Sequence, residues 1–245
     1  MIPWIPDGAP PYLFPPTSAA VAEPNGLLCA GGDLSAPRLI EAYRRGIFPW
    51  FNEGDPILWW SPEARTVFVP ARFHISRSLK RTLRRRKFDV TVDRAFGDVM
   101  AGCAAPRAGA AGTWISDDMQ TAYSALHQHG HAHSVECWME GKLVGGVYGV
   151  GLGQMFFGES MYSATADASK VALAFLCTGP YAMVDCQLPN PHLQRLGSQT
   201  VSRFDFERFV EAKIDMPPPH LGVALERWSA KHGVWADVGD SLGAE

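Results

Sequence analysis

Two apolar runs separated by a glycine-rich stretch dominate the pattern between Leu143 and Ser163. The runs LVGGVYGV and QMFFGESMYS flank GLG, and glycine supplies the positive φ angles that a tight turn needs. This pattern predicts a β-hairpin. A bulge at Gly158 would bring Phe156 to the face of the second strand that carries Glu159. Strict alternation along the strand places four other residues on the face of Glu159: Met155, Phe157, Met161 and Ser163.

A single carboxylate, Glu159, stands in this apolar strand. Burial of an unpaired carboxylate costs several kcal/mol, on the order of 5. Either a buried Arg or Lys neutralises it, or it belongs to a functional site. The segment AMVDCQ predicts another short strand, in which Asp185 and Gln187 share one side. Three polar groups on two strands among aromatic and thioether side chains favour a site.

Composition limits the class of protein. The chain has 245 residues, of which 47% are hydrophobic and 19% charged, so it is predicted to be globular and soluble. A net charge of −3 gives no general attraction to nucleic acid. The five cysteines form no CxxC pair, which favours a reducing compartment over disulfides or a zinc ribbon. The proline-cut N-terminus is no signal peptide, and no apolar run reaches membrane-spanning length. We expect a cytoplasmic protein.

The chain is predicted to fold as α+β, with a small domain at residues 1–63 and a larger one at 64–215 whose central mixed sheet is flanked by helices. Residues 216–245 are predicted to form a proline-rich tail with one weak helix. Tryptophans and phenylalanines crowd residues 46–62, where proline and glycine prevent a regular amphipathic element. This aromatic segment is either a core between domains or the wall of an apolar pocket.

Residues 76–87, SRSLKRTLRRRK, are the strongly basic stretch. On a helix, Leu79 and Leu83 point away from one stripe of guanidinium groups. The stripe is either a solvated helix face or a site for a phosphate backbone, and the lack of nearby acids favours phosphate. Its members are Arg77, Arg81, Arg84 and Arg85.

Two other patterns resemble ligand sites without completing one. Histidines stand at positions 127, 129, 131 and 133, but Gly130 interrupts them and no nearby Cys or acid completes a ligand set, so no metal is expected. The GVGLG segment lacks the following helix that a phosphate cradle would require. The segment is predicted to form the turn of the hairpin.

Taken in order, these motifs resemble the leucyl/phenylalanyl-tRNA–protein transferase family over about residues 10–210. The resemblance is carried by EPNGLLCAGGDL, AYRRGIFPWF, PILWWSP, HISRSLKR, GTWI, AHSVE, LVGGVYGV, GESMYS, ASK and VDCQ. It implies a small N-terminal domain followed by a domain of the GCN5-related acetyltransferase type, without cofactor, metal or CoA. It also implies transfer of Leu, Phe and, less efficiently, Met from aminoacyl-tRNA to proteins or peptides with N-terminal Arg or Lys, which marks proteins for the N-end rule pathway.

The resemblance also implies the roles of individual residues. Glu159, Asp185 and Gln187 match the family's catalytic residues, and the four arginines of the basic stretch match its tRNA-binding patch. The acyl side chain would contact Trp50, Trp114, Val147, Phe156, Met161, Ser163 and Val184. Relatives carry a longer helix and loop before the DCQ strand, whereas this chain runs from Cys177 directly through Thr-Gly-Pro-Tyr-Ala. The resemblance therefore specifies the pocket wall at Phe175 and Leu176, and the fine acyl preference, less closely than the other pocket residues.

The implied reaction is aminolysis of an ester. We expect Asp185 to act as base or proton relay, Gln187 to orient the amine or carbonyl, and Glu159 to hold the acceptor's ammonium. In an alternative, the carboxylates only orient and a tRNA hydroxyl relays the proton. Two other functions stay open: a CoA-dependent N-acyltransferase, which lacks a convincing pyrophosphate loop, and a non-catalytic tRNA-binding module. The polar triplet, with no evident partner charges in the sequence, argues against the module.

Overall fold

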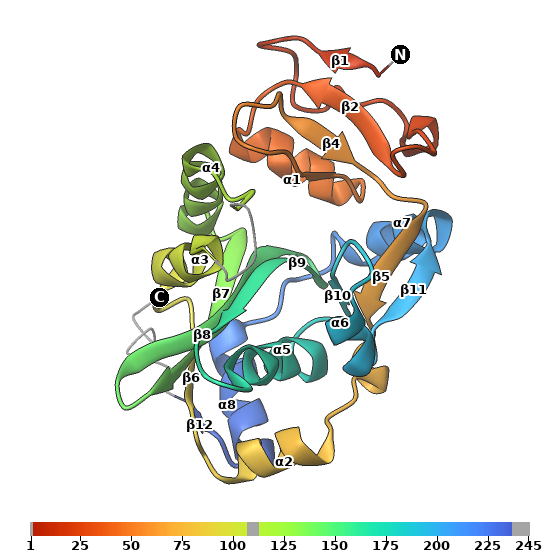
Figure 1. Cartoon of the computed structure of the whole chain (residues 1–245). Helices are drawn as coiled ribbons and strands as arrows, with labels where there is room; N and C mark the ends of the chain where they lie inside the picture. The colour runs from red at the N-terminus through yellow and green to blue at the C-terminus, as the bar shows by residue number, and fades with distance from the viewer. Residues whose placement is uncertain (1, 107–112, 237–245) are drawn as a thin grey trace.

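The computed structural model describes residues 2–106 and 113–236, which form a small and a large lobe (Figure 1). The small lobe has a four-stranded sheet in the order β1-β2-β4-β3, with one α-helix, α1, beside it. Gly46, at φ 70°, follows the end of α1 and turns the chain into β3. The elements of this lobe are β1 (Trp4–Ile5), a 3₁₀ turn (Thr17–Ala19), β2 (Leu27–Gly31), α1 (Ala36–Arg44), β3 (Phe48–Pro49) and β4 (Leu58–Trp60).

The large lobe is built on an eight-stranded mixed sheet in the order β11-β5-β10-β9-β8-β7-β6-β12. β10 runs parallel to β9 and β12 parallel to β6, whereas the other neighbours are antiparallel. The strands are β5 (Ala64–Phe68), β6 (Asp89–Val92), β7 (Ala132–Met139), β8 (Lys142–Leu152), β9 (Met155–Ser163), β10 (Met183–Asp185), β11 (Gln199–Ser202) and β12 (Trp235–Ala236). The prediction of an α+β protein with a mixed sheet is confirmed.

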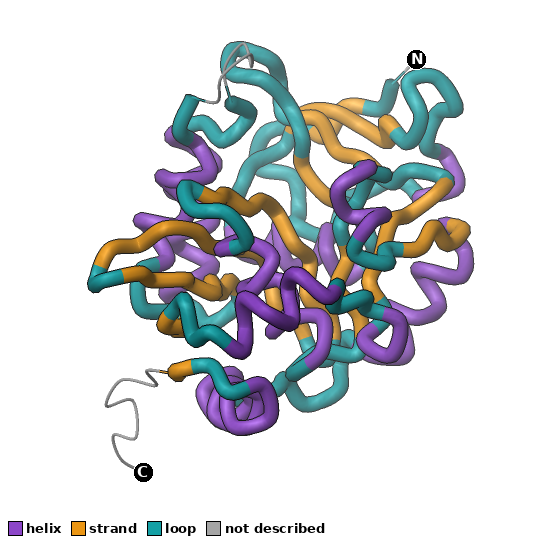
Figure 2. Tube along the Cα trace, turned by 60° about the horizontal axis from the view of Figure 1, so that its bottom comes forward, coloured by secondary structure: helices purple, strands orange, loops and turns teal. Residues whose placement is uncertain are grey.

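Helices cover both faces of the large sheet (Figure 2). Those on the face toward the small lobe are α3 (Phe96–Ala104), α4 (Asp117–Gln128) and α7 (Arg203–Lys213), which share a buried cluster with α1. Those in the cluster on the opposite face are α2 (Arg77–Arg84), α5 (Ala168–Thr178), α6 (Pro191–Arg195) and α8 (Leu221–His232). A 3₁₀ turn at Pro70–Arg72 leads from β5 towards α2.

The predicted hairpin is present as the antiparallel pair β8 and β9. Its register shifts once, because Gly149 pairs with Gly158 whereas Tyr148 pairs with Ser160. Glu159 is therefore the extra residue of a β-bulge, next to the position where the sequence analysis expected one. The bulge needs glycine on the opposite strand, since a Cβ at Gly149 would lie 2.1 Å from the carbonyl oxygen of Phe157.

The bulge changes which side chains share a face. Phe157 packs in the cluster on the side of the small lobe, where its ring centroid is 5.1 Å from that of Tyr43. Phe156 and Met161 belong to the cluster on the opposite side. The prediction that Met161 lies on the same face as Phe157 is therefore wrong, because the extra residue shifts the alternation of every later position. The expected turn of Phe156 to the Phe157 face does not occur either.

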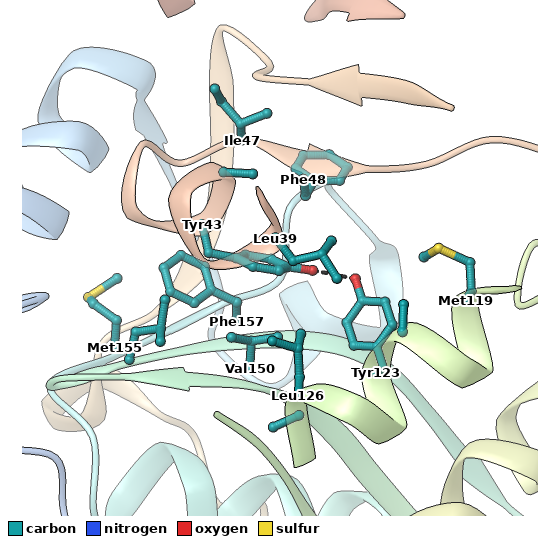
Figure 3. Packing of buried hydrophobic residues seen from close by; sticks show 14 of the residues in the cluster. Leu39, Tyr43, Ile47, Phe48, Met119, Tyr123, Leu126, Val150, Met155 and Phe157 are labelled. Atoms are coloured by element: carbon teal, nitrogen blue, oxygen red, sulfur yellow. Dashed lines mark hydrogen bonds between the residues drawn. The ribbon is translucent and has the colours of Figure 1, made fainter. Parts of the chain in front are cut away.

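The lobes meet through aromatic packing. The side chains of Leu39 and Tyr43 from α1 contact the layer formed by Tyr123 of α4 and Phe157 of β9 (Figure 3). Trp59 instead lies inside the small lobe, with its ring centroid 5.0 Å from that of Phe14. The aromatic segment at residues 46–62 thus contributes both to a core and, as described below, to a cavity wall.

The C-terminal part was expected to be a tail, but residues 221–236 belong to the fold. Leu225 and Trp228 of α8 are buried in the cluster on the opposite face, and β12 pairs with β6 at the sheet edge. The signal was present, because Leu221, Leu225 and Trp228 stand at i, i+4 and i+7 and form one apolar stripe, but the preceding run of prolines indicates the end of a domain. Residues 237–245 of the predicted tail lie outside the described residues. No helix of the described part is long and apolar enough to cross a membrane.

Candidate functional site

Glu159 sits where the two lobes meet and accepts hydrogen bonds from neutral donors. The Tyr43 hydroxyl donates to its Oε1 at 2.7 Å, and the Tyr123 hydroxyl donates to its Oε2 at 3.0 Å. The two hydroxyl oxygens are also in hydrogen-bond contact with each other, drawn as a dashed line in Figure 3. Because each phenol carries one proton, a hydroxyl that donates to the other phenol does not donate to Glu159 at the same time. Helix α1 of the small lobe and helix α4 of the large lobe therefore fix this carboxylate together.

Burial raises the pKa of Glu159 to about 7, although the hydrogen bonds from Tyr43 and Tyr123 lower it. Burial and the nearby negative charge of Glu159 raise the pKa of both phenols well above their usual range. The phenols therefore stay protonated and act as donors. Glu159 is left to change its protonation state near neutral pH, which is the property of an acid–base group.

Asp185, at the end of β10, is fully buried and paired with a cation. Arg65 of β5 donates from Nε to Oδ1 at 2.9 Å and from Nη2 to Oδ2 at 2.8 Å. The same guanidinium donates to the Gly46 carbonyl at 2.8 Å and lies over the rings of Phe48 and Phe206. The expectation that the polar triplet lacks partner charges is therefore wrong for Asp185, because β5 and β10 are neighbours in the sheet.

Gln187 joins the two carboxylates. Its backbone N–H donates to Asp185 Oδ1 at 3.0 Å, and its side-chain Nε2 donates to Glu159 Oε1 at 3.3 Å. Gln187 has φ 54°, in the left-handed region that non-glycine residues rarely adopt. The Asp185 contact thus holds an unusual backbone conformation that aims the amide at Glu159. All three predicted polar residues meet at one place.

A first cavity of about 220 Å³ opens beside this meeting point. Three of the residues predicted to form the acyl pocket line this cavity: Val147, Met161 and Val184. Leu173 of α5 and Leu193 of α6 add further apolar surface. Phe175 and Leu176 do not line it, so the wall on this helix comes from a different residue than the family pattern indicates. The cavity can hold the apolar side chain of an amino acid while the amino acid's polar backbone groups lie at Glu159 and Gln187.

A second cavity of about 300 Å³ lies on the side of the small lobe. It is lined by Phe48, Trp50, Trp114 and Leu188, and it shares Glu159, Cys186, Gln187 and Asn190 with the first cavity. Trp50 and Trp114, which were predicted to contact the acyl side chain, are thus in the neighbouring cavity. The two cavities meet at Glu159 and Gln187, so two different groups could approach the same point.

Two predicted acyl contacts line neither cavity. Phe156 is fully buried, with its ring centroid 5.1 Å from that of Tyr181. The hydroxyl of Ser163 donates to the Thr165 carbonyl at 2.8 Å and accepts from the Ser169 N–H at 3.3 Å, which connects the end of β9 to α5. Neither Phe156 nor Ser163 is therefore exposed to either cavity in this structure.

The predicted arginine stripe is exposed on α2, while Leu79 and Leu83 are buried beneath it. Arg77, Arg81 and Arg84 belong to the helix, and Arg85 follows as its C-cap. Within the described residues, none of the four forms an ion pair with an acid. The stripe is therefore free to bind an external anion.

Two other places that could bind a ligand, a cavity and the histidine tract, lack a comparable group of reactive side chains. A larger cavity of about 540 Å³ lies between the end of α5 and α8, and no predicted site residue lines it. The histidine tract bonds within the protein: His127 to the Ala132 carbonyl and His133 to Asp93. No group of three or more His, Cys, Asp or Glu side chains in residues 2–106 and 113–236 is placed to hold a metal ion.

Several residues that build the site were not predicted, among them Arg65, Tyr43, Tyr123 and Leu193. Arg65 carried a signal, because it is the one charged side chain in the apolar strand ARTVFVP and a buried Asp needs such a partner. Tyr43 and Tyr123 stand in ordinary helical stripes, which predict burial but not the direction of a hydroxyl. Leu193 lies on a five-residue helix, too short for periodicity to reveal its inner face.

Comparisons with known proteins identify the family of this chain. A family model described as leucyl/phenylalanyl-tRNA protein transferase matches residues 67–211, and the model of that family's N-terminal domain matches residues 32–63. A leucyl/phenylalanyl-tRNA–protein transferase from Pseudomonas fluorescens is 55% identical over 208 residues, covering 83% of this chain and 92% of that protein. One from Nitrosospira multiformis is 52% identical over 212 residues, covering 85% and 90%.

A solved structure of a conserved protein of unknown function from Staphylococcus epidermidis covers 72% of this chain and 68% of that chain. It has a TM-score of 0.39 and 11% identity, a likeness too low to support a statement on fold or function. The sequence matches cover nearly the whole site and both lobes. The chain therefore belongs to the leucyl/phenylalanyl-tRNA–protein transferase family and is an aminoacyltransferase.

Proposed function

We propose that this protein transfers leucine, phenylalanine and, less efficiently, methionine from aminoacyl-tRNA to the N-terminal Arg or Lys of acceptor proteins, marking them for the N-end rule pathway in the cytoplasm, where charged tRNA is found. One observation carries the proposal. An apolar cavity of about 220 Å³ ends at a carboxylate whose pKa lies at about 7, in a chain of this family. The cavity fits an unbranched or γ-branched apolar side chain, and the carboxylate fits a reacting amine.

The two cavities divide the substrates. The acyl side chain enters the first cavity, lined by Val147, Met161 and Val184. The terminal nucleoside of the tRNA or the acceptor's N-terminus enters the second, where Trp50 and Trp114 offer flat apolar faces. The ester then lies at the junction, close to Glu159 and Gln187. Bringing ester and amine together at one point supplies a large share of the rate, through effective molarity.

Glu159 is the proposed proton carrier. The acceptor's α-amine has a pKa of about 7.7–8.0, so part of it is neutral at pH 7. The neutral amine attacks the ester carbonyl, the new C–N bond forms, and Glu159 accepts the amine proton. The C–O bond to the ribose then breaks, and Glu159 returns the proton to the ribose oxygen. Such transfer contributes roughly 10²- to 10⁴-fold.

Asp185 is better assigned as a positioning residue than as the base. Its two oxygens already accept from Arg65 and from the Gln187 N–H. Asp185 is fully buried and lines neither cavity, so it does not face the substrate, whereas its contact with the Gln187 N–H keeps the Gln187 amide directed at the ester. The proposal thus differs from both earlier possibilities, since Asp185 only orients while Glu159, rather than Asp185 or a tRNA hydroxyl, carries the proton.

The exposed arginines of α2 are proposed to bind the phosphate backbone of the tRNA. Guanidinium groups pair well with phosphates and release counterions on binding. We further propose that the large lobe has the GCN5-related acetyltransferase fold. The succession of β9, α5 and the parallel strand β10 supports this assignment.

The proposal is tested by transfer of labelled phenylalanine from charged tRNA to a peptide with N-terminal Arg. A peptide that differs only in starting with Gly serves as control. We expect transfer to the first peptide and at least tenfold less to the second. Equal transfer to both, or none to either, contradicts the proposed function. CoA-dependent acylation of the same peptides, if observed instead, would favour an N-acyltransferase.

A further inference from the structure

One wall of the first cavity is built differently from the others. Three walls come from strands of the large sheet, and a fourth comes from Leu173 in the middle of the buried helix α5. Val147 and Met161 are direct partners in the β8–β9 ladder, so their positions are fixed by the sheet. Leu193 instead projects from α6, a helix of five residues that lies outside the sheet.

Hydrogen bonds at both ends hold helix α6 in place. The side-chain oxygen of Asn190 accepts from the His192 N–H at 2.7 Å and begins the helix. At the other end, the Leu193 carbonyl accepts from Leu196 and Ser198, and the Leu196 carbonyl accepts from the His74 N–H at 2.9 Å. Leu193 is therefore presented to the cavity from a fixed position.

The turn after α6 cannot shift easily. Gly197 has φ 91°, and a Cβ there would lie 2.7 Å from the Arg72 carbonyl oxygen, so the turn packs directly against the segment that follows β5. Changes in the size of the residue at position 193 consequently change the cavity rather than move the helix. The neighbouring Leu196 is also buried but lines no cavity described above.

We propose that Leu193 is a specificity-determining residue that sets the depth of the acyl cavity. The inference rests on the proposed function. Within a cavity of about 220 Å³, the isobutyl group of Leu193 occupies space that a larger acyl side chain would need. A single methylene in an apolar pocket changes discrimination roughly 10- to 200-fold. Leu193 on α6 thus adds a wall to the one that Leu173 of α5 provides in place of Phe175 and Leu176.

The test compares kcat/KM for tRNA charged with Phe, Leu, Met and Trp, using the acceptor with N-terminal Arg. Leu193→Phe shortens the cavity and is expected to lower the Phe-to-Leu ratio about tenfold. Leu193→Ala deepens it and is expected to raise transfer of Trp relative to Leu by about the same factor. Leu193→Val removes one methylene, keeps the fold, and should move the ratio in the direction of Ala.

Leu196→Ala is the matched control, because it removes the same atoms from the same segment without opening the cavity. It should lower all four values by a common factor. The inference is overturned if the ratios of folded Leu193 variants stay within twofold of the unchanged protein, or if Leu196→Ala shifts them as much. No transfer by the unchanged protein would instead contradict the proposed function.

Discussion

The end of β10 and the bulge of β9 each hold a carboxylate at the site, but their surroundings differ. Asp185 is paired with the guanidinium of Arg65, whereas Glu159 accepts hydrogen bonds from two phenols and an amide. Two charge-assisted hydrogen bonds from one guanidinium hold the Asp185 carboxylate in a single orientation. A carboxylate stabilised by neutral donors can gain and lose a proton near neutral pH. In the proposed mechanism, Asp185 therefore has the positioning role and Glu159 the proton-transfer role.

The largest expected effect comes from removing the cation. Arg65→Met leaves Asp185 buried without a partner and should lower the free energy of unfolding by about 3–5 kcal/mol. Activity should disappear as well, because Gln187 and the Gly46 turn lose their support. Urea denaturation measures the first effect and the transfer assay the second.

The double variant Arg65→Met with Asp185→Leu removes both charges and separates the two effects. It should regain most of the stability, since apolar replacement of a buried pair is often neutral. It should not regain activity. A stability loss below about 1 kcal/mol for Arg65→Met alone would show that the pair does not hold the site together.

Glu159→Gln should lower kcat roughly 10²- to 10⁴-fold, because the amide cannot carry a proton. Glu136 is the matched control: its pKa is also raised by burial, but it is fully buried, accepts from Thr91 and Ser134 and lines no cavity described above. Glu136→Gln should leave kcat within about threefold for protein that stays folded. Equal losses in both variants would make Glu159 a structural group.

The pH dependence of stability tests the same residue. The pKa of Glu159 is raised in the folded state from 4.5 to about 7, so the folded protein binds a proton that the unfolded chain releases. The stabilising contribution is fully present below about pH 4.5 and is lost as pH rises through about 7. The free energy of unfolding of the unchanged protein, relative to Glu159→Gln, should therefore fall between pH 5 and pH 8. A flat difference would contradict the raised pKa.

Smaller changes are expected from the phenols. Tyr43→Phe or Tyr123→Phe removes one donor that lowers the pKa of Glu159, so the pH midpoint of kcat should rise by about one unit. At pH 7 this corresponds to about a fivefold lower rate, which higher pH should restore. A downward shift, or an equal loss at every pH, would mean that the phenols act only by packing.

The smallest effect on the chemistry is expected from α2. Arg77→Ala and Arg84→Ala should leave stability within about 0.5 kcal/mol, since both side chains are exposed. Each should weaken binding of charged tRNA and reduce the salt slope by about 0.9. Transfer from a minimal aminoacyl-adenosine should stay unchanged. Equal losses on both substrates would place the arginines in the site itself.

The sequence predicted the secondary structure around the site better than the contacts within it. The sequence pattern predicted the β8–β9 hairpin and β10, because these strands are apolar runs with glycine or proline close by. It misplaced Met161, since one extra residue reverses the alternation. The pairing of Arg65 with Asp185 joins positions far apart in the chain, which periodicity cannot reveal. The tyrosine hydroxyls depend on how α1 and α4 pack, a property of the folded lobes.

The extra residue in β9 has a consequence for how this enzyme can change. Substitutions along the strand alter one side chain at a time and leave the rest where they are. Deleting or adding one amino acid between Glu159 and Met161 would instead rotate Met161 away from the first cavity and turn Tyr162 towards it. A change of length in this segment is therefore expected to disturb the cavity more than a substitution at any one of its positions.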